Sequence, residues 1–174
     1  DSWFCDADTL KKLTAVNENL YDISVLEGVM GYYDGIGFSG RGSAYEIAEI
    51  TGTPVVLVVN CRGMGASVEA VINGFINLKK DSHIVGVIFN QLPGRLYNDA
   101  KDAVLKLGIK PLGYLEYDEK FHIDSRHLGL IGADEIADFN ERLAYLSNVM
   151  EQSIDIDGII ELSQSAVRLP EAVN

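Results

Sequence analysis

The chain contains four short runs of apolar residues, and each run ends at a polar or glycine-containing segment. The runs span residues 23–26, 54–60, 84–90 and 111–115. Strands that are apolar on both faces are typical of a parallel sheet covered by helices on each side. Each run therefore predicts a strand buried within such a sheet.

Outside these runs, apolar residues recur every three or four positions, which is the spacing of one face of an α-helix. This spacing predicts helices over residues 6–19, 64–78, 97–107, 135–150 and 157–167. A capping box formed by Ser43 and Glu46 predicts a further helix over residues 43–52. The helix at 135–150 is strongly amphipathic. Its predicted apolar face consists of Ile136, Phe139, Leu143, Leu146 and Met150.

The alternation of strands and helices predicts an α/β fold with a mainly parallel sheet and helices on both faces. Residues 1–174 are expected to form a single domain. The predicted order begins on a helix with no strand before it, whereas doubly wound nucleotide-binding domains usually place their phosphate loop after the first strand. We therefore expect a domain that is truncated at its N-terminus.

Composition narrows the class of partner. The chain has 174 residues and a formal net charge of −12, which disfavours binding to nucleic acid or to an anionic membrane. No apolar run approaches the roughly 20 residues that span a bilayer. Cys5 and Cys61 lie far apart without metal-ligand spacing. A reduced, cytoplasmic protein is expected.

A stretch rich in glycine follows the first predicted strand. Within it, Gly35, Gly37 and Gly40 match the G-x-G-x-x-G pattern of dinucleotide-binding loops. That fingerprint requires the first glycine directly after a strand, but residues 28–34 intervene here. We interpret the match as accidental. Because no glycine is followed by lysine, the chain contains no Walker A loop.

Polar side chains end three of the predicted strands. Glu27 follows the first strand, Asn60 ends the second and Asn90 ends the third. The carboxyl ends of parallel strands meet at one edge of the sheet, where ligands bind in open α/β folds. A carboxylate there can hold Mg²⁺ against phosphates, and an asparagine amide can read a purine base. Loop capping and turn formation explain each residue alone equally well. We expect the three side chains to meet at one edge.

Arg126 and His127 lie in a predicted loop close to His122. The two histidines are spaced wrongly for one helix face, so no metal site is predicted there. Arg126 and His127 are expected to bind an anionic substrate, with a partly exposed loop pair as the alternative.

The most specific motif lies at residues 25–35. It reads Val25-Leu-Glu-Gly-Val-Met-Gly-Tyr-Tyr-Asp-Gly35 and resembles the signature segment of the cobyrinic acid a,c-diamide synthases. These are glutamine-dependent amidating enzymes of cobalamin biosynthesis. Residues 52–64, 74–75, 84–90 and 126–130 resemble further elements of that family in the same order. The resemblance extends over nearly the whole chain. Asn60 is a departure, because the family usually carries aspartate there.

The resemblance implies a P-loop-NTPase-like fold, similar to dethiobiotin synthetase, in which this chain is the central part of the synthetase (amidoligase) domain. The family's P-loop and its glutaminase domain have no counterpart in these residues. The implied partners are a tetrapyrrole substrate and the glutaminase domain of the same parent chain. A homo-oligomer is also expected, since an incomplete sheet leaves an unpaired edge that invites self-association.

The resemblance also implies a two-step amidation. ATP phosphorylates the a and c carboxylates of cobyrinate or a related tetrapyrrole, and ammonia from glutamine then displaces the phosphate. In this scheme Glu27 fits a catalytic Mg²⁺ ligand, and Asp34 fits a second catalytic residue near the carboxylate or the ammonia. Asn60 and Asn90 fit the nucleotide site, with Asn90 as the adenine reader. The implied substrate contacts are Tyr33, Arg126 and His127.

Two other functions stay open at this level. A dethiobiotin-synthetase-like ATP-dependent ligase would share the fold and the Glu27–Gly28 pair, although residues 30–34 argue against it. The other is a catalytically inactive nucleotide-fold segment with a structural or dimerisation role. A Gly-Lys-Thr loop preceding these residues would decide for a nucleotide-using enzyme.

Overall fold

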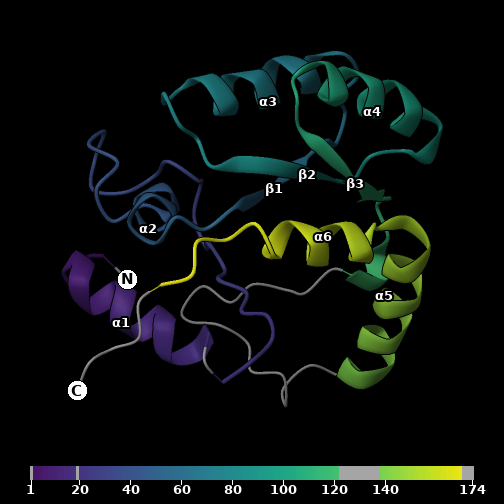
Figure 1. The fold of residues 1–174 in the computed structure, drawn as a ribbon. Coiled ribbons are helices and arrows are strands. Elements are labelled where there is room, and N and C mark those ends of the chain that lie inside the picture. The colour runs from purple at the N-terminus through teal and green to yellow at the C-terminus, as the bar shows by residue number, and fades with distance from the viewer. Residues whose placement is uncertain (1, 19, 122–137, 170–174) are drawn as a thin grey trace.

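Three parallel strands form the sheet in a computed structural model that describes residues 2–18, 20–121 and 138–169 (Figure 1). The strands are β1 (Val55–Asn60), β2 (Ile84–Asn90) and β3 (Lys110–Leu115), in the spatial order β1-β2-β3. The predictions of a parallel sheet and of these three strands are confirmed. β2 is buried or half-buried at every position, as expected for a strand that is apolar on both faces, whereas Val58 of β1 is 60% exposed.

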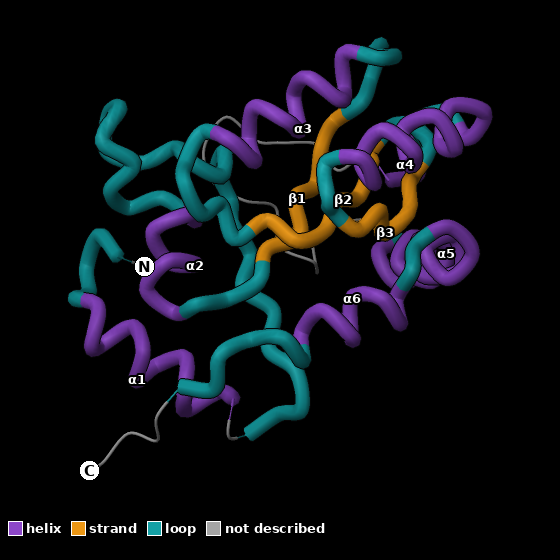
Figure 2. Tube along the Cα trace, turned by 45° about the horizontal axis from the view of Figure 1, so that its top comes forward, coloured by secondary structure: helices purple, strands orange, loops and turns teal. Residues whose placement is uncertain are grey.

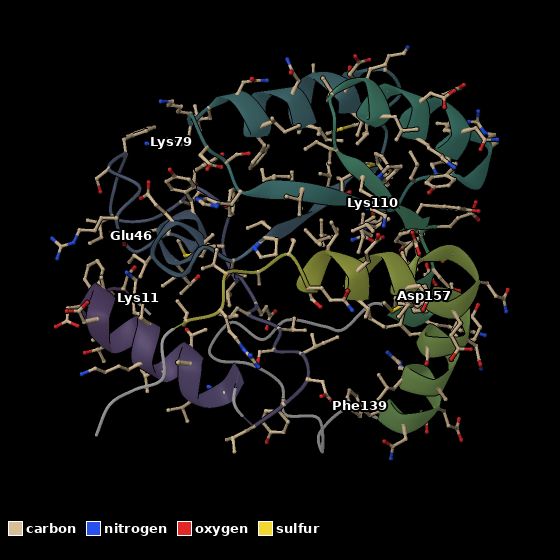
Figure 3. The ribbon with its side chains drawn as sticks, in the orientation of Figure 1. Lys11, Glu46, Lys79, Lys110, Phe139 and Asp157 are labelled. Atoms are coloured by element: carbon tan, nitrogen blue, oxygen red, sulfur yellow. The ribbon has the colours of Figure 1, made fainter. Side chains whose placement is uncertain are left out.

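Helices cover both faces of the sheet, as predicted. Figures 1 and 2 show α3 (Ser67–Asn77) and α4 (Tyr97–Lys106) on one face and α6 (Ile156–Ser163) on the other. The α3–α4 side holds most of the core. Fully buried side chains there include Ile72, Val87, Phe89 and Val104. On the other face, Lys110 of β3 forms an ion pair with Glu161 of α6 (Figure 3).

Two helices precede the sheet in the chain, α1 (Ala7–Glu18) and α2 (Ala44–Thr51). Both lie to one side of the sheet in Figure 1, and α2 leads directly into β1. Gly52 ends α2 in the left-handed conformation (φ 68°), and its N–H donates to Ala48 O. This is a common helix stop, because glycine adopts positive φ without strain.

The predicted strand at residues 23–26 does not form, and that prediction is wrong. The segment has no strand pairing, and Val25 is 87% exposed. A strand needs a neighbouring backbone to receive its hydrogen bonds. Among the described residues β1 pairs with β2 alone, so no neighbour is supplied to residues 23–26.

The remaining helix α5 (Phe139–Ser153) begins and ends later than predicted. Its predicted apolar face is only partly used, because Leu143 is 51% exposed while Leu146 and Met150 are half-buried. Ile136 lies outside the described residues. The other helices match their predictions to within a few residues at each end, as expected where caps rather than periodicity set the boundary.

No dinucleotide loop forms in the glycine-rich stretch. Gly35, Gly37 and Gly40 lie in a loop, and the next helix begins at Ala44 rather than at the third glycine. The interpretation of that match as accidental is confirmed. Within the described ranges, none of the helices combines the length and apolarity that a membrane crossing requires.

Helix α2 begins with a capping box, as the sequence predicts. Ser43 Oγ accepts a hydrogen bond from Glu46 N at 3.2 Å, and Glu46 Oε2 accepts one from Gly42 N at 2.6 Å (Glu46 is labelled in Figure 3). The Ser2 hydroxyl beside the carboxylate and the Gly42 N–H lower the pKa of Glu46. Ionised Glu46 therefore stabilises the start of α2.

We expect Glu46→Gln to destabilise the fold at pH 7 and to matter less in acid. Because the folded pKa is lowered, the contribution of ionised Glu46 is fully present above its ordinary value of 4.5 and is lost as pH falls through the folded pKa. Urea unfolding at pH 7 and pH 3 measures the difference, which we expect to be about 0.3–1 kcal/mol at pH 7. Glu151→Gln, on the exposed surface of α5, controls for loss of a surface carboxylate. An equal effect of Glu46→Gln at both pH values would contradict the role of the charge.

Candidate functional site

β1 and β2 end side by side on two asparagines. Asn60 and Asn90 are register partners, and Cys61 N donates to Asn90 O at 2.7 Å. Asn60 Oδ1 accepts a hydrogen bond from Arg62 N at 3.0 Å, which fixes the turn after β1. Asn90 is half-buried. The prediction that these two asparagines meet at the carboxyl edge is confirmed.

Two loops meet over this edge from either side of β2. Arg62 follows β1, Tyr117 follows β3, and the guanidinium carbon of Arg62 lies 5.3 Å from the centre of the Tyr117 ring. Since β1 and β3 flank β2 in the sheet, this contact bridges the end of the central strand. Tyr117 remains 53% exposed and offers an aromatic face to a ligand. Sequence analysis missed this pair, because its partners come from loops that are distant in the chain.

Glu27 does not lie at this edge. The next residue, Gly28, is so close to α2 that a Cβ atom on it would stand 2.9 Å from Ala44 Cβ. Tyr45, the second residue of α2, packs its ring 6.3 Å from that of His83, directly before β2. The segment that contains Glu27 is therefore held near the amino ends of the strands.

The predicted meeting of Glu27 with Asn60 and Asn90 is wrong for Glu27. The prediction depended on a strand at residues 23–26 that would run parallel to β1 and end at Glu27. Because that segment is unpaired, nothing carries the carboxylate to the other end of the sheet. The Glu27 side chain is exposed.

Two tyrosines attach the glycine-rich loop to the amino edge. The Tyr32 hydroxyl donates to Ser82 O and the Tyr33 hydroxyl donates to Phe75 O, each at 2.6 Å. Burial raises the pKa of both phenols. The hydroxyl of Tyr33 is thus hydrogen-bonded within the protein, where it anchors the loop. The predicted substrate contact through Tyr33 stays a prediction.

Asp34 lies on an exposed turn directly after this anchor. Its N–H donates to Gly31 O at 2.8 Å, and its carboxylate folds back over Gly31, into the place that a Cβ atom there would take. The carboxylate is exposed, so it can reach a ligand. The predicted catalytic role of Asp34 is therefore sterically open.

A cavity of about 560 Å³ lies beside residues 20–26, near the amino end of β1. Its walls include Leu26, Thr53, Ser163 and Arg168. The cavity adjoins the segment that leads to Glu27, and its lining includes neither Asn60 nor Asn90. The structure therefore presents two separate regions, a carboxyl edge with asparagines and an amino side with the signature segment.

Among the described residues, no group of three or more His, Cys, Asp or Glu side chains is arranged to hold a metal ion. A metal that is carried by a nucleotide needs fewer protein ligands than such a group supplies. The predicted substrate contacts Arg126 and His127, together with His122, lie outside the described residues.

Comparison with known proteins finds several relatives that share one name. The chain is 39% identical to the cobyrinate a,c-diamide synthase of Sulfurisphaera tokodaii over 98% of its length and 38% of the relative's. It is 34% identical to the enzyme of that name from Saccharolobus solfataricus over 98% of this chain and 39% of the relative. It is 38% identical to the enzyme of that name from Caldanaerobacter subterraneus subsp. tengcongensis over 94% of this chain and 36% of the relative. The chain belongs to the cobyrinate a,c-diamide synthase family.

The family assignment confirms the resemblance carried by residues 25–35. The chain spans little more than a third of the length of the cobyrinate a,c-diamide synthases that it matches, such as 38% of the first. No family model matches the chain. No solved structure matches it either.

Proposed function

We propose that this chain is the nucleotide-using part of a longer enzyme that amidates the a and c carboxylates of cobyrinate or a related tetrapyrrole. ATP and glutamine are the proposed co-substrates. The observation that carries the proposal is the 39% identity to a cobyrinate a,c-diamide synthase over 98% of this chain. A match over almost every residue of the chain supports a shared role for this part of the enzyme.

We propose further that the complete domain has a P-loop-NTPase-like fold. The all-parallel sheet, with its helices on both faces, supports this assignment. Two features of the described residues also support it: β1 pairs with β2 alone and leaves its other edge unpaired, and the strand-like segment at 23–26 has no strand partner. In the longer protein a further strand would cover that edge, residues 23–26 would join the sheet, and Glu27 would reach the carboxyl edge.

The proposed chemistry has two steps. A carboxylate oxygen of the tetrapyrrole attacks the γ-phosphorus of ATP, and ADP leaves. Ammonia from glutamine then attacks the acyl carbon, phosphate leaves with the former carboxylate oxygen, and the nitrogen loses a proton. Positioning and charge stabilisation supply most of the rate acceleration in such phosphoryl transfers.

The residues fit magnesium that is bound together with a nucleotide. Mg²⁺ in such sites keeps several waters and is held by one or two carboxylates plus phosphate oxygens, so a single exposed carboxylate suffices. Glu27 would be this ligand. When bound, Mg²⁺ neutralises the charge that develops at the transferred phosphate. Asp34 would orient the carboxylate or accept a proton from the incoming nitrogen.

The nucleotide base would lie at the carboxyl edge. Asn90 offers both a donor and an acceptor to a purine, and Asn60 lies beside it in register. Arg126 and His127 would contact the carboxylates of the macrocycle, with Tyr33 as a further contact. An inactive segment with a structural role is the alternative that the exposed edge of β1 favours.

The chain of 174 residues alone is expected to bind ATP weakly or not at all, and to hydrolyse none. A P-loop and its lysine supply most of the binding contacts to the β- and γ-phosphates, and no Gly-Lys pair occurs in this sequence. Calorimetry with Mg·ATP measures this, and a micromolar dissociation constant would show that the phosphate site has been misplaced. We also expect a dimer or larger species, because β1 has an unpaired edge among the described residues. A monomer by light scattering would mean that this edge is covered.

The function is tested by incubating the longer protein with cobyrinate, glutamine and Mg·ATP and separating the products. We expect the a,c-diamide, formed only when ATP is present. If the protein amidates no tetrapyrrole but turns over a small diamine-type substrate with ATP, the dethiobiotin-synthetase-like alternative is favoured. Absence of any turnover would favour the structural role.

A further inference from the structure

Tyr32 and Tyr33 are the two central residues of a tight turn that carries Asp34. The turn is closed by a hydrogen bond from Asp34 N to Gly31 O, at 2.8 Å. Both phenol hydroxyls donate, each at 2.6 Å, to backbone carbonyls at the two ends of the connection from α3 to β2 (Figure 1). The turn is therefore fixed at two neighbouring points, and the next residue along the chain is Asp34.

Tyr32 joins three parts of the fold. Its hydroxyl donates to Ser82 O in the turn before β2, and its own carbonyl accepts from Tyr45 N, in the first turn of α2, at 2.9 Å. The first N–H groups of a helix have no partner within it, so this contact also stabilises the start of α2. The Tyr32 ring packs 4.7 Å from that of Tyr33, and the residue is 7% exposed. Because its hydroxyl is buried and bonded within the protein, Tyr32 acts on the loop and not on a ligand.

The turn that receives the Tyr32 hydroxyl has a closely fixed shape. His83 follows Ser82 and adopts φ 55°, a left-handed conformation that is uncommon for a residue other than glycine. Such a conformation persists where the surrounding structure fixes it. Here His83 N donates to Asp81 Oδ1 at 3.1 Å, and His83 O accepts from Val55 N at 2.8 Å. The Ser82 carbonyl therefore has a fixed place relative to β1 and β2.

The loop beyond Asp34 has a different character. Residues 35–42 contain four glycines, at positions 35, 37, 40 and 42. Glycine restricts the backbone weakly, because it has no Cβ atom. Ile36 N donates to Arg41 O at 2.7 Å, a contact within the loop that does not tie Asp34 to the sheet. The place of the exposed Asp34 carboxylate relative to the sheet is therefore set mainly by the two tyrosines.

We infer that Tyr32 is a positioning residue for Asp34, because its buried hydrogen bond to the turn before β2 holds the Asp34 carboxylate in one place. The inference rests on the proposed function, in which Asp34 orients the tetrapyrrole carboxylate or accepts a proton. Reacting groups must be held close to their working geometry, and a displacement of about 1 Å can lower a rate roughly a hundredfold. Tyr32 acts through Asp34 and makes no contact with the substrate.

The test measures tetrapyrrole amidation by the longer protein carrying Tyr32→Phe. Phenylalanine keeps the packing of the ring and removes only the hydroxyl. We expect kcat to fall roughly ten- to a hundredfold. The KM for ATP should stay unchanged, because the proposed nucleotide contacts lie at the opposite edge of the sheet. Tyr145→Phe is the control, since it also removes a hydroxyl that donates a hydrogen bond, to Asp118 Oδ2 at 2.8 Å, and it should leave kcat unchanged.

A double-mutant cycle separates positioning from a general loss of structure. If Tyr32 acts through Asp34, Tyr32→Phe should lower kcat no further in a protein that already carries Asp34→Asn. A merely structural role would lower kcat by the same factor in both backgrounds, and that result would overturn the inference. A Tyr32→Phe protein with the kcat of the parent would overturn it as well. In either case, amidation by the parent would leave the proposed function intact.

Hydrogen exchange of the Asp34 N–H gives a readout that needs no turnover. The anchored turn protects this N–H, so its exchange should be about tenfold faster in Tyr32→Phe and unchanged in Tyr145→Phe. An unchanged exchange rate in Tyr32→Phe would overturn the inference. If the parent amidates no tetrapyrrole while Tyr32→Phe still speeds this exchange, the proposed function fails and the anchoring of Asp34 by Tyr32 is supported.

Discussion

Glu27→Gln in the longer protein is expected to lower the rate of ATP-dependent amidation about a thousandfold, the scale of losing several kcal/mol of metal-assisted charge stabilisation. The amide keeps the size and hydrogen-bonding shape of the side chain but removes the charge that would hold Mg²⁺. Because Glu27 is exposed, the fold should be unaffected. Steady-state rates over a range of Mg²⁺ concentrations, with melting temperatures alongside, make the measurement.

Glu151→Gln serves as the matched control, since Glu151 lies exposed on α5 and outside the proposed site. It should retain full activity. Near-normal turnover of Glu27→Gln at saturating Mg²⁺ would rule out the metal-ligand role. In that case the position of Glu27 beside α2, away from Asn60 and Asn90, would be its working position.

Gly113→Ala is expected to cost roughly 3–5 kcal/mol of unfolding free energy, the sum of a strained backbone and an overpacked site. Gly113 lies in β3 with φ 113° and forms a bridge to Ile154, which joins α5 to α6. A Cβ atom would collide with Ser153 O and stand 2.7 Å from Ile154 Cα. Backbone cannot give way as a flexible side chain can, so the α5–α6 junction must separate from β3.

Gly74→Ala is the matched comparison. Gly74 lies within α3, and nothing stands within 4 Å of the place its Cβ would take. Alanine there should stabilise the chain by about 0.5–1 kcal/mol. Urea unfolding of both variants measures the contrast. Equal midpoints for Gly113→Ala and the parent would contradict the close approach of β3 to Ile154.

The parts of the fold that the sequence predicted correctly are those set by local pattern. β2 is apolar at successive positions, so its burial on both faces follows from its composition, and the apolar runs of β1 and β3 also locate those strands correctly. The start of α2 follows from Ser43 and Glu46, whose capping contacts span three residues. The meeting of Asn60 and Asn90 follows from parallel pairing, which aligns strand ends automatically.

The parts that the sequence mispredicted depend on distant partners. Residues 23–26 have the composition of a strand, but pairing needs a neighbour that composition does not supply. The wrong prediction that Glu27 lies at the carboxyl edge follows from the strand that was expected at residues 23–26. The contact between Arg62 and Tyr117 arises from loops brought together by the sheet, so periodicity carries no signal for it.

The central claim, that this chain serves an enzyme which activates a tetrapyrrole carboxylate with ATP, is tested most directly by isotope transfer. Cobyrinate labelled with oxygen-18 in its carboxylates is incubated with the longer protein, glutamine and Mg·ATP, and the released phosphate is examined by mass spectrometry. An acyl phosphate passes one carboxylate oxygen to phosphate for each amide formed, so labelled phosphate should appear in step with amidation. Amide formation with unlabelled phosphate, or phosphate release without amide, would contradict the account.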